Sequence, residues 1–257
     1  MQARQLPLQR GWGWVADGLQ LWRRNPTVLI FASFTYMLLL LIVASIPFIG
    51  QIAAYMLMPI LSLGVLNTCR AIDEGRKPGP DTLFSGFKSN VQQLVTVGGL
   101  YLVGTIIVLM ITSVIDGGAL WRVMVGKEVL DPSSSELPAG LFTGLLIGSV
   151  LSLPVLAAYW FAPILVGWWR ISAPKAVFFS LYACLQNWRP FMAFGLAIFV
   201  MIGLLPRIVI GFAGMVSPLL SSVLLLVLPV VLIPVLFASF YINARDVFGT
   251  NSHERLT

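Results

Sequence analysis

The stretch TVLIFASFTYMLLLLIVASIPFIGQIAAYMLMPILSLGVL, residues 27–66, determines the class of fold. Two apolar runs, Thr27–Ile46 and a second from Gln51 to about Cys69, flank a tight turn at Pro47 and Gly50. A helix that crosses about 30 Å of hydrocarbon needs about 20 apolar residues. The stretch therefore predicts two membrane-spanning helices joined as a hairpin.

Four more apolar runs follow. We expect spans over Val91–Ile115, Gly140–Trp168, Phe191 to Arg207 or Gly211, and Pro218–Tyr241, with a polar loop over Asp116–Pro138. Only 10% of the residues are charged, against about 25% in a soluble domain, and the mean hydropathy is +0.91. The predicted fold is an all-α integral membrane protein. Its single transmembrane domain, residues 1–257, has six helices in three hairpins, each preceded by a short amphipathic interfacial helix.

The basic residues predict the orientation. Of the 16 Lys and Arg residues, all but Arg122, Lys127 and Arg207 fall on one side of the predicted spans, from Arg4 to Arg255. Because Lys and Arg accumulate in cytoplasmic segments, both termini are expected in the cytoplasm. No basic run with interleaved aromatics indicates a nucleic-acid partner.

Each predicted hairpin follows a segment with apolar residues at helical spacing. The three sets are Trp12, Val15, Leu19 and Trp22; Phe84, Phe87, Val91 and Leu94; and Phe178, Leu181, Leu185 and Trp188. The second helices also share Pro59-Ile-Leu, Pro163-Ile-Leu and Pro234-Val-Leu. These likenesses favour three degenerate repeats, residues 11–76, 82–175 and 176–247; the alternative is chance similarity among apolar segments.

Aromatic and basic residues gather on the predicted cytoplasmic side. The candidate contacts to lipid headgroups are Trp12, Trp22, Arg23, Arg24, Trp188 and Arg189. Trp14 and Trp168 are expected in the same aromatic belt. Either lipid recognition or simple anchoring explains the pattern.

Small residues and prolines mark the helix contacts. Gly140, Gly144, Gly148 and Ser152 share one helix face and predict close packing, either inside the chain or between two copies. The candidate kinks are Pro59, Pro154, Pro163, Pro229 and Pro234. Broken helices can also line a transport site, so a transport site at these prolines is the alternative interpretation.

Arg207 is the one charge that could lie within a span. We expect it at the far membrane edge, where arginine can extend to the headgroups, in preference to the membrane interior. A pairing with Asp116 is a further hypothesis.

No catalytic, cofactor or metal site is expected. The chain has one histidine, His253, and two separated cysteines, and it carries none of the usual nucleotide-binding, hydrolase or metalloprotease motifs. We therefore expect a protein that is not an enzyme.

The opening GWGWVADGLQLWRRNP (residues 11–26) and the later LQNWRP (residues 185–190) resemble a family of uncharacterised six-span proteobacterial inner-membrane proteins. More distantly, the chain is similar to the membrane domain fused to some glycerophosphodiester phosphodiesterases. The resemblance implies a multi-hairpin fold in the bacterial inner membrane and no established activity.

Two roles follow. The first is a scaffold that interacts with lipid or protein at the cytoplasmic leaflet, with membrane lipids, other membrane proteins or a second copy as partners. The alternative is a small-molecule or lipid transporter or channel. An accessory subunit that docks through the glycine row is a third option.

Overall fold

The computed structural model describes residues 3–124 and 140–249, in which every regular element is a helix. Lys127, His253, Arg255 and most of the expected polar loop lie outside the described residues. The long helices are α2 (Pro26–Ala44), α3 (Gly50–Asp73), α4 (Val91–Ile115), α6 (Leu141–Trp160) with α7 (Ala162–Trp169), α9 (Trp188–Ile198) with the π-helix η2 (Phe199–Leu204) and α10 (Leu205–Val216), and α11 (Pro218–Phe248). The shorter ones are α1 (Arg10–Arg24), the 3₁₀-helix η1 (Pro80–Lys88), α5 (Ala119–Met124) and α8 (Ala173–Gln186).

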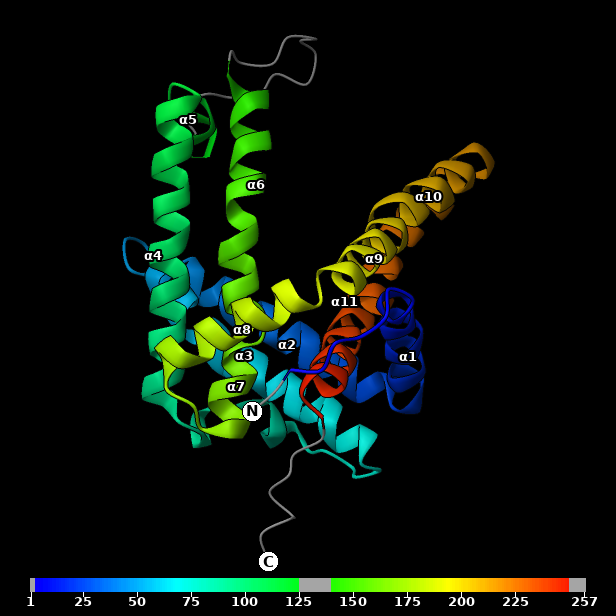
Figure 1. The fold of residues 1–257 in the computed structure, drawn as a ribbon. Coiled ribbons are helices and arrows are strands. Elements are labelled where there is room, and N and C mark those ends of the chain that lie inside the picture. Colours follow the sequence, from blue (N-terminus) through cyan, green and yellow to red (C-terminus); the bar gives the residue numbers. More distant parts are fainter. Residues whose placement is uncertain (1–2, 125–139, 250–257) are drawn as a thin grey trace, which may run out of the picture.

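Six of these segments are long and apolar enough to cross a membrane, which confirms the predicted number. Consecutive long helices lie against each other as α2 with α3, α4 with α6, and α10 with α11. Figure 1 shows the α4–α6 pair and the α10–α11 pair rising from a common base and diverging. The outer halves of the helices carry many exposed large apolar side chains, such as Phe212 and Met215. Lipid can solvate such a surface, whereas water would not.

The hydrophobic core lies at the base, where the three pairs meet. Its largest cluster includes Trp14, Leu29, Phe161 and Ala238, which come from α1, α2, the α6–α7 junction and α11. In α3 the most apolar stretch is 56% buried, compared with 17–22% in the other five spans. The base is therefore built around α3.

The short helices connect the pairs in a cyclic order. The helix η1 packs on α3, α8 packs on α6 and α7, and α1 packs on α11. Each short helix thus contacts the second long helix of the preceding pair, and the first helix of the chain contacts the last. This arrangement closes the base into a ring of contacts.

The second short segment differs from the prediction. Phe84, Phe87, Val91 and Leu94 do not form one helix, because η1 ends at Lys88 and Val91 begins α4. A 3₁₀-helix places residues i and i+3 on one side, and Leu83 and Gly86 are accordingly buried. Gly86 lies so close to α3 that a Cβ atom there would be 2.9 Å from the carbonyl carbon of Ile60.

The face by which α1 packs is shifted by one residue from the predicted one. The buried residues are Gly11, Trp14, Gly18 and Leu21, while Trp12 lies outward. Trp14 is fully buried, so its placement in an aromatic belt was wrong. The prediction followed the large apolar side chains, whereas the two glycines decide which face can approach a neighbour.

Candidate functional site

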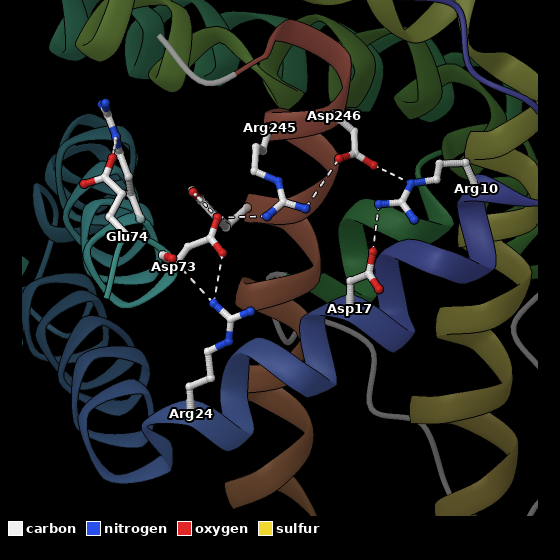
Figure 2. Close-up of polar contacts among 9 residues, drawn as sticks. Arg10, Asp17, Arg24, Asp73, Glu74, Arg245 and Asp246 are labelled. Carbon is white, nitrogen blue, oxygen red and sulfur yellow. Dashed lines mark hydrogen bonds and ion pairs between the residues drawn. The ribbon is translucent and has the colours of Figure 1, made fainter. Parts of the chain in front are cut away.

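Six charged residues form one network at the base, with arginines and aspartates alternating (Figure 2). Three come from α1, one from the end of α3 and two from the end of α11. In order of contact they are Arg24, Asp73, Arg245, Asp246, Arg10 and Asp17. The network joins α1 and α11 to α3.

The two aspartates at the helix ends are the best satisfied members. Arg245 Nη1 donates to Asp73 Oδ2 at 2.8 Å, and the Tyr241 hydroxyl donates to the same oxygen at 3.0 Å. Trp14 Nε1 donates to Asp246 Oδ2 at 3.1 Å, which also accepts from Arg10 Nε. Each aspartate side chain is only 14% exposed, and a carboxylate at such depth needs partners of this kind.

Arg10 couples two helices. Its Nη2 donates to Asp17 Oδ2 at 2.7 Å within α1, and its Nε donates to Asp246 of α11. The hydrogen bond with Asp246 raises the pKa of the Arg10 guanidinium, although burial opposes the change. The charged Arg10 guanidinium therefore joins a carboxylate of its own helix to one of α11.

The network lines an open pocket of about 600 Å³ at the ends of α3 and α11. We call it the end pocket, and its lining residues are Arg4, Leu6, Arg10, Asp73, Arg245, Asp246 and Gly249. The N-terminal segment forms one wall. Its backbone is held by Arg4 N donating to Val247 O at 2.9 Å, and by the Asn187 side chain, which donates to Arg4 O at 3.0 Å and accepts from Leu6 N at 2.9 Å.

Two glycines bring α1 close to its neighbours. A Cβ atom at Gly11 would be 2.7 Å from Phe194 N in α9, and one at Gly18 would be 2.6 Å from Ser239 N in α11. Both distances are too short for a side chain. The close approach places Trp14, which lies between the two glycines, within reach of Asp246.

Ser180 of α8 fixes the break between α6 and α7. Its Oγ accepts from Phe161 N at 2.8 Å and donates to Ala157 O at 2.7 Å. In an unbroken helix these two backbone groups would bond to each other, so the hydroxyl is inserted between them. Such insertion, next to a proline in the first turn of α7, is a known cause of a helix break.

The predicted glycine row faces the turn after α4. A Cβ atom at Gly144 would be 3.1 Å from Asp116 Cβ, and one at Gly140 would be 2.6 Å from Asp116 O. Gly148 lies near Thr112, and Ser152 Oγ donates to Gly148 O at 2.7 Å. The three glycines thus pack inside the chain, against α4 and the turn that follows it.

The hypothesis that Arg207 pairs with Asp116 was wrong. Asp116 accepts instead from Gly118 N at 2.8 Å and Leu120 N at 2.9 Å, and so closes its own turn. Arg207 is exposed on α10, and α10 continues to Val216, beyond the predicted end of that span. The turn supplies both hydrogen bonds of the Asp116 carboxylate, because backbone N–H groups a few residues away are much nearer to it than an arginine on another hairpin.

The candidate prolines lie in different surroundings. Pro59 is buried in α3, and Gly98 of α4 lies against the carbonyl of Tyr55, the group that Pro59 leaves without its helical partner. Pro163 occupies the first turn of α7. Pro154 lies within α6, and Pro229 and Pro234 lie within the continuous helix α11.

The candidate headgroup residues do not form one site. Arg24 belongs to the network through Asp73, and Arg23 is exposed beside it. Trp12 is exposed and Trp22 is half-buried on α1. Trp188 is exposed on a different helix, α9, with the Arg189 guanidinium 5.5 Å from its ring centre. Within the described residues, no group of three His, Cys, Asp or Glu side chains could hold a metal ion.

Comparison with known proteins places the chain among membrane proteins. A probable inner membrane protein of Burkholderia thailandensis is 34% identical over 259 aligned residues, which cover 97% of this chain and 94% of the relative. This chain belongs to the same family. No protein-family model matches the chain, and no solved structure matches it. Membership of this inner-membrane family and the six apolar helices make the chain a multi-pass protein of the inner membrane.

For this member of the inner-membrane family, sequence reasoning missed several residues of the site. Asp73, Asp246, Asn187 and Ser180 were not singled out, because their partners are far away in sequence. One available signal was the spacing of charges at span ends: Arg245 follows Pro234 as Arg70 follows Pro59. The equivalence is only positional, since Arg70 bonds to Glu74 and stacks on Trp168.

Proposed function

We propose that this chain is a scaffold protein, without enzymatic activity, that binds phospholipid headgroups and partner proteins at the cytoplasmic leaflet of the inner membrane. The observation that carries the proposal is the arginine–aspartate network with its end pocket, a polar site at one end of a bundle that is otherwise apolar. A polar site of this kind suits contacts with headgroups or with a soluble partner.

The proposed orientation places the end pocket and both termini in the cytoplasm. The uneven distribution of Lys and Arg supports it. In this arrangement the three helix pairs are membrane hairpins, and α1, η1 and α8 lie at the cytoplasmic interface as parts of three degenerate repeats. The cyclic contacts of these short helices support the repeats.

The helix α8 supports an interfacial position. Its buried face is made of small residues, including Ala176, Ser180 and Ala183. Its opposite face exposes Phe178, Tyr182 and Leu185. Large apolar side chains on the outside of a helix that crosses the end of a bundle are suited to the headgroup and acyl boundary.

The packing of the base supports a scaffold over a transporter. Phe161, Ile164 and Leu165 are fully buried there, and the nearby Ser180 hydroxyl is itself buried and bonded to backbone groups. A transport path would need an opening lined by polar groups at this level. The resemblance to the membrane domain fused to phosphodiesterases stays a prediction and adds no activity to the proposal.

Purification of the full chain from native membranes in a mild detergent tests the proposal. We expect co-purified phospholipid, measured by mass spectrometry of a lipid extract, together with at least one stoichiometric protein. Lipid-free and partner-free protein that carries a solute across reconstituted vesicles would establish the transporter alternative instead.

A further inference from the structure

We infer that the end pocket binds a singly charged phosphodiester, and that the Arg4 guanidinium is its principal ligand. The inference rests on the proposed lipid-binding role and assigns that role a site. The phosphodiester is the chemical group shared by common phospholipid headgroups.

The charge balance of the pocket selects a single negative charge. Three arginines and two aspartates line it, so its side chains carry one surplus positive charge. Asp17 and Arg24 extend the network without changing this balance. A phosphodiester carries one negative charge, whereas a phosphate monoester carries about −1.5 to −2 at pH 7. The surplus therefore matches the diester.

Arg4 is the arginine available for the ligand. Arg10 and Arg245 are bonded to aspartates, while no described residue accepts a hydrogen bond from the Arg4 side chain. A guanidinium can hold phosphate oxygens through two parallel N–H groups. Arg10 and Arg245 are held in place by their aspartates and provide a positively charged wall behind it.

The backbone that carries Arg4 is fixed before any ligand arrives. Arg4 N bonds to Val247 O, and Arg4 O accepts from the buried side chain of Asn187. Only the side chain must be ordered on binding, which lowers the entropic cost. The end of α11 also attracts Arg4, since Gly249 is adjacent, but a helix C-terminus offers only about half a negative charge.

Apolar residues of the N-terminal segment indicate a lipid as the source of the phosphodiester. Leu6 lines the pocket, and Leu8, two residues further along the same segment, is 54% exposed. Trp12 is 47% exposed on the outer face of α1, and indole rings favour the headgroup level of a membrane. A headgroup held by Arg4 would therefore lie next to an apolar wall at the level of the membrane surface.

The test compares the delipidated full chain with Arg4→Gln, with Arg4→Lys, and with Arg170→Gln, which has the same net charge as Arg4→Gln. Arg170 is an exposed arginine at the end of α7, outside the pocket lining and outside the candidate headgroup residues, so it controls for general attraction to anionic lipid. Native mass spectrometry would measure the apparent Kd for added phosphatidylglycerol. We expect Arg4→Gln to weaken binding about tenfold, the loss of a hydrogen-bonded charge. Arg4→Lys should restore only part of the affinity, because lysine keeps the charge but lacks the two parallel N–H groups, and Arg170→Gln should change the affinity less than about twofold.

The other outcomes separate the possibilities. Equal weakening by Arg4→Gln and Arg170→Gln would overturn the assignment of the ligand to the pocket and leave the lipid-binding role intact. A lower melting temperature for Arg4→Gln with unchanged lipid affinity would also overturn the pocket assignment. Arg4 would then only stabilise the fold, by balancing the partial negative charge at the C-terminus of α11. Absence of lipid binding by the unmodified chain would refute the proposed function. In that case binding of inorganic phosphate that depends on Arg4 would overturn the phosphodiester assignment and identify a soluble phosphate as the ligand of the pocket.

Discussion

Gly18→Ala tests whether close contact between α1 and α11 holds the base together. The new Cβ atom would lie 2.6 Å from Ser239 N, and ordinary contacts begin at 3.4 Å. The helix α1 must therefore move away from α11 by about 0.8 Å, the difference between these two distances. The Ser239 hydroxyl is also too close and can rotate away, but the backbone N and Cα atoms of Ser239 cannot, so the two helices must separate.

The magnitude follows from three terms. Overpacking of this kind costs about 1–3 kcal/mol. The shift would stretch the bond from Trp14 to Asp246, now 3.1 Å, beyond hydrogen-bonding distance, and a bond to a charged group contributes about 1.5–3 kcal/mol. Alanine regains about 1 kcal/mol of helix propensity. We expect a net loss of about 1.5–5 kcal/mol from the combined terms.

The two native cysteines provide the assay. Cys69 and Cys184 are both buried and free, so a thiol-reactive dye reports unfolding of the purified protein on heating. Gly195→Ala is the matched control, because a Cβ atom there meets nothing within 4 Å. Gly18→Ala should melt at a clearly lower temperature than Gly195→Ala. Equal melting temperatures for the two variants would refute the contact between α1 and α11.

Three further predictions concern other contacts. Asn187→Ala removes two bonds to the N-terminal segment, so hydrogen exchange at residues 3–8 should become faster, with a loss of about 1–3 kcal/mol; unchanged exchange would contradict the clamp. Ser180→Ala leaves Phe161 N without its partner and should cost about 1–3 kcal/mol, whereas the exposed Ser149→Ala should melt like the parent protein. Phe48→Cys, at the fully exposed α2–α3 turn, should react with a membrane-impermeant maleimide on intact cells; reaction only after lysis would reverse the orientation.

The six spans were predictable because each is a local property of the sequence. A run such as residues 27–46 contains enough apolar residues to cross hydrocarbon whatever lies beside it. The positions of Pro163 and Gly144 were likewise sufficient to indicate a kink and a close helix contact. What these residues contact was not predictable, since Ser180 and Asp116 come from other parts of the chain.

The charge network could not be predicted for a physical reason. Arg10 and Asp246 are separated by 236 positions in sequence, and every apolar helix between them is a plausible neighbour for α1. Periodicity indicates that α1 has an apolar side, but Trp12 and Trp22 on that side are large and fit a membrane interface as well as a protein core. Gly11 and Gly18 determine which side of α1 is buried, because only the side with these glycines allows the backbone of another helix to approach closely.

The position of α1 also explains why one short helix has two different apolar faces. Its docking partners α9 and α11 are among the last helices that the structure describes, so the face with Gly11 and Gly18 has no partner until those helices have been made. Until then another environment must stabilise α1. The face with Trp12 and Trp22, followed by Arg23 and Arg24, suits the headgroup region of the membrane. We therefore expect membrane insertion and assembly to use different sides of the same helix, with the buried side forming its contacts only when the ring closes.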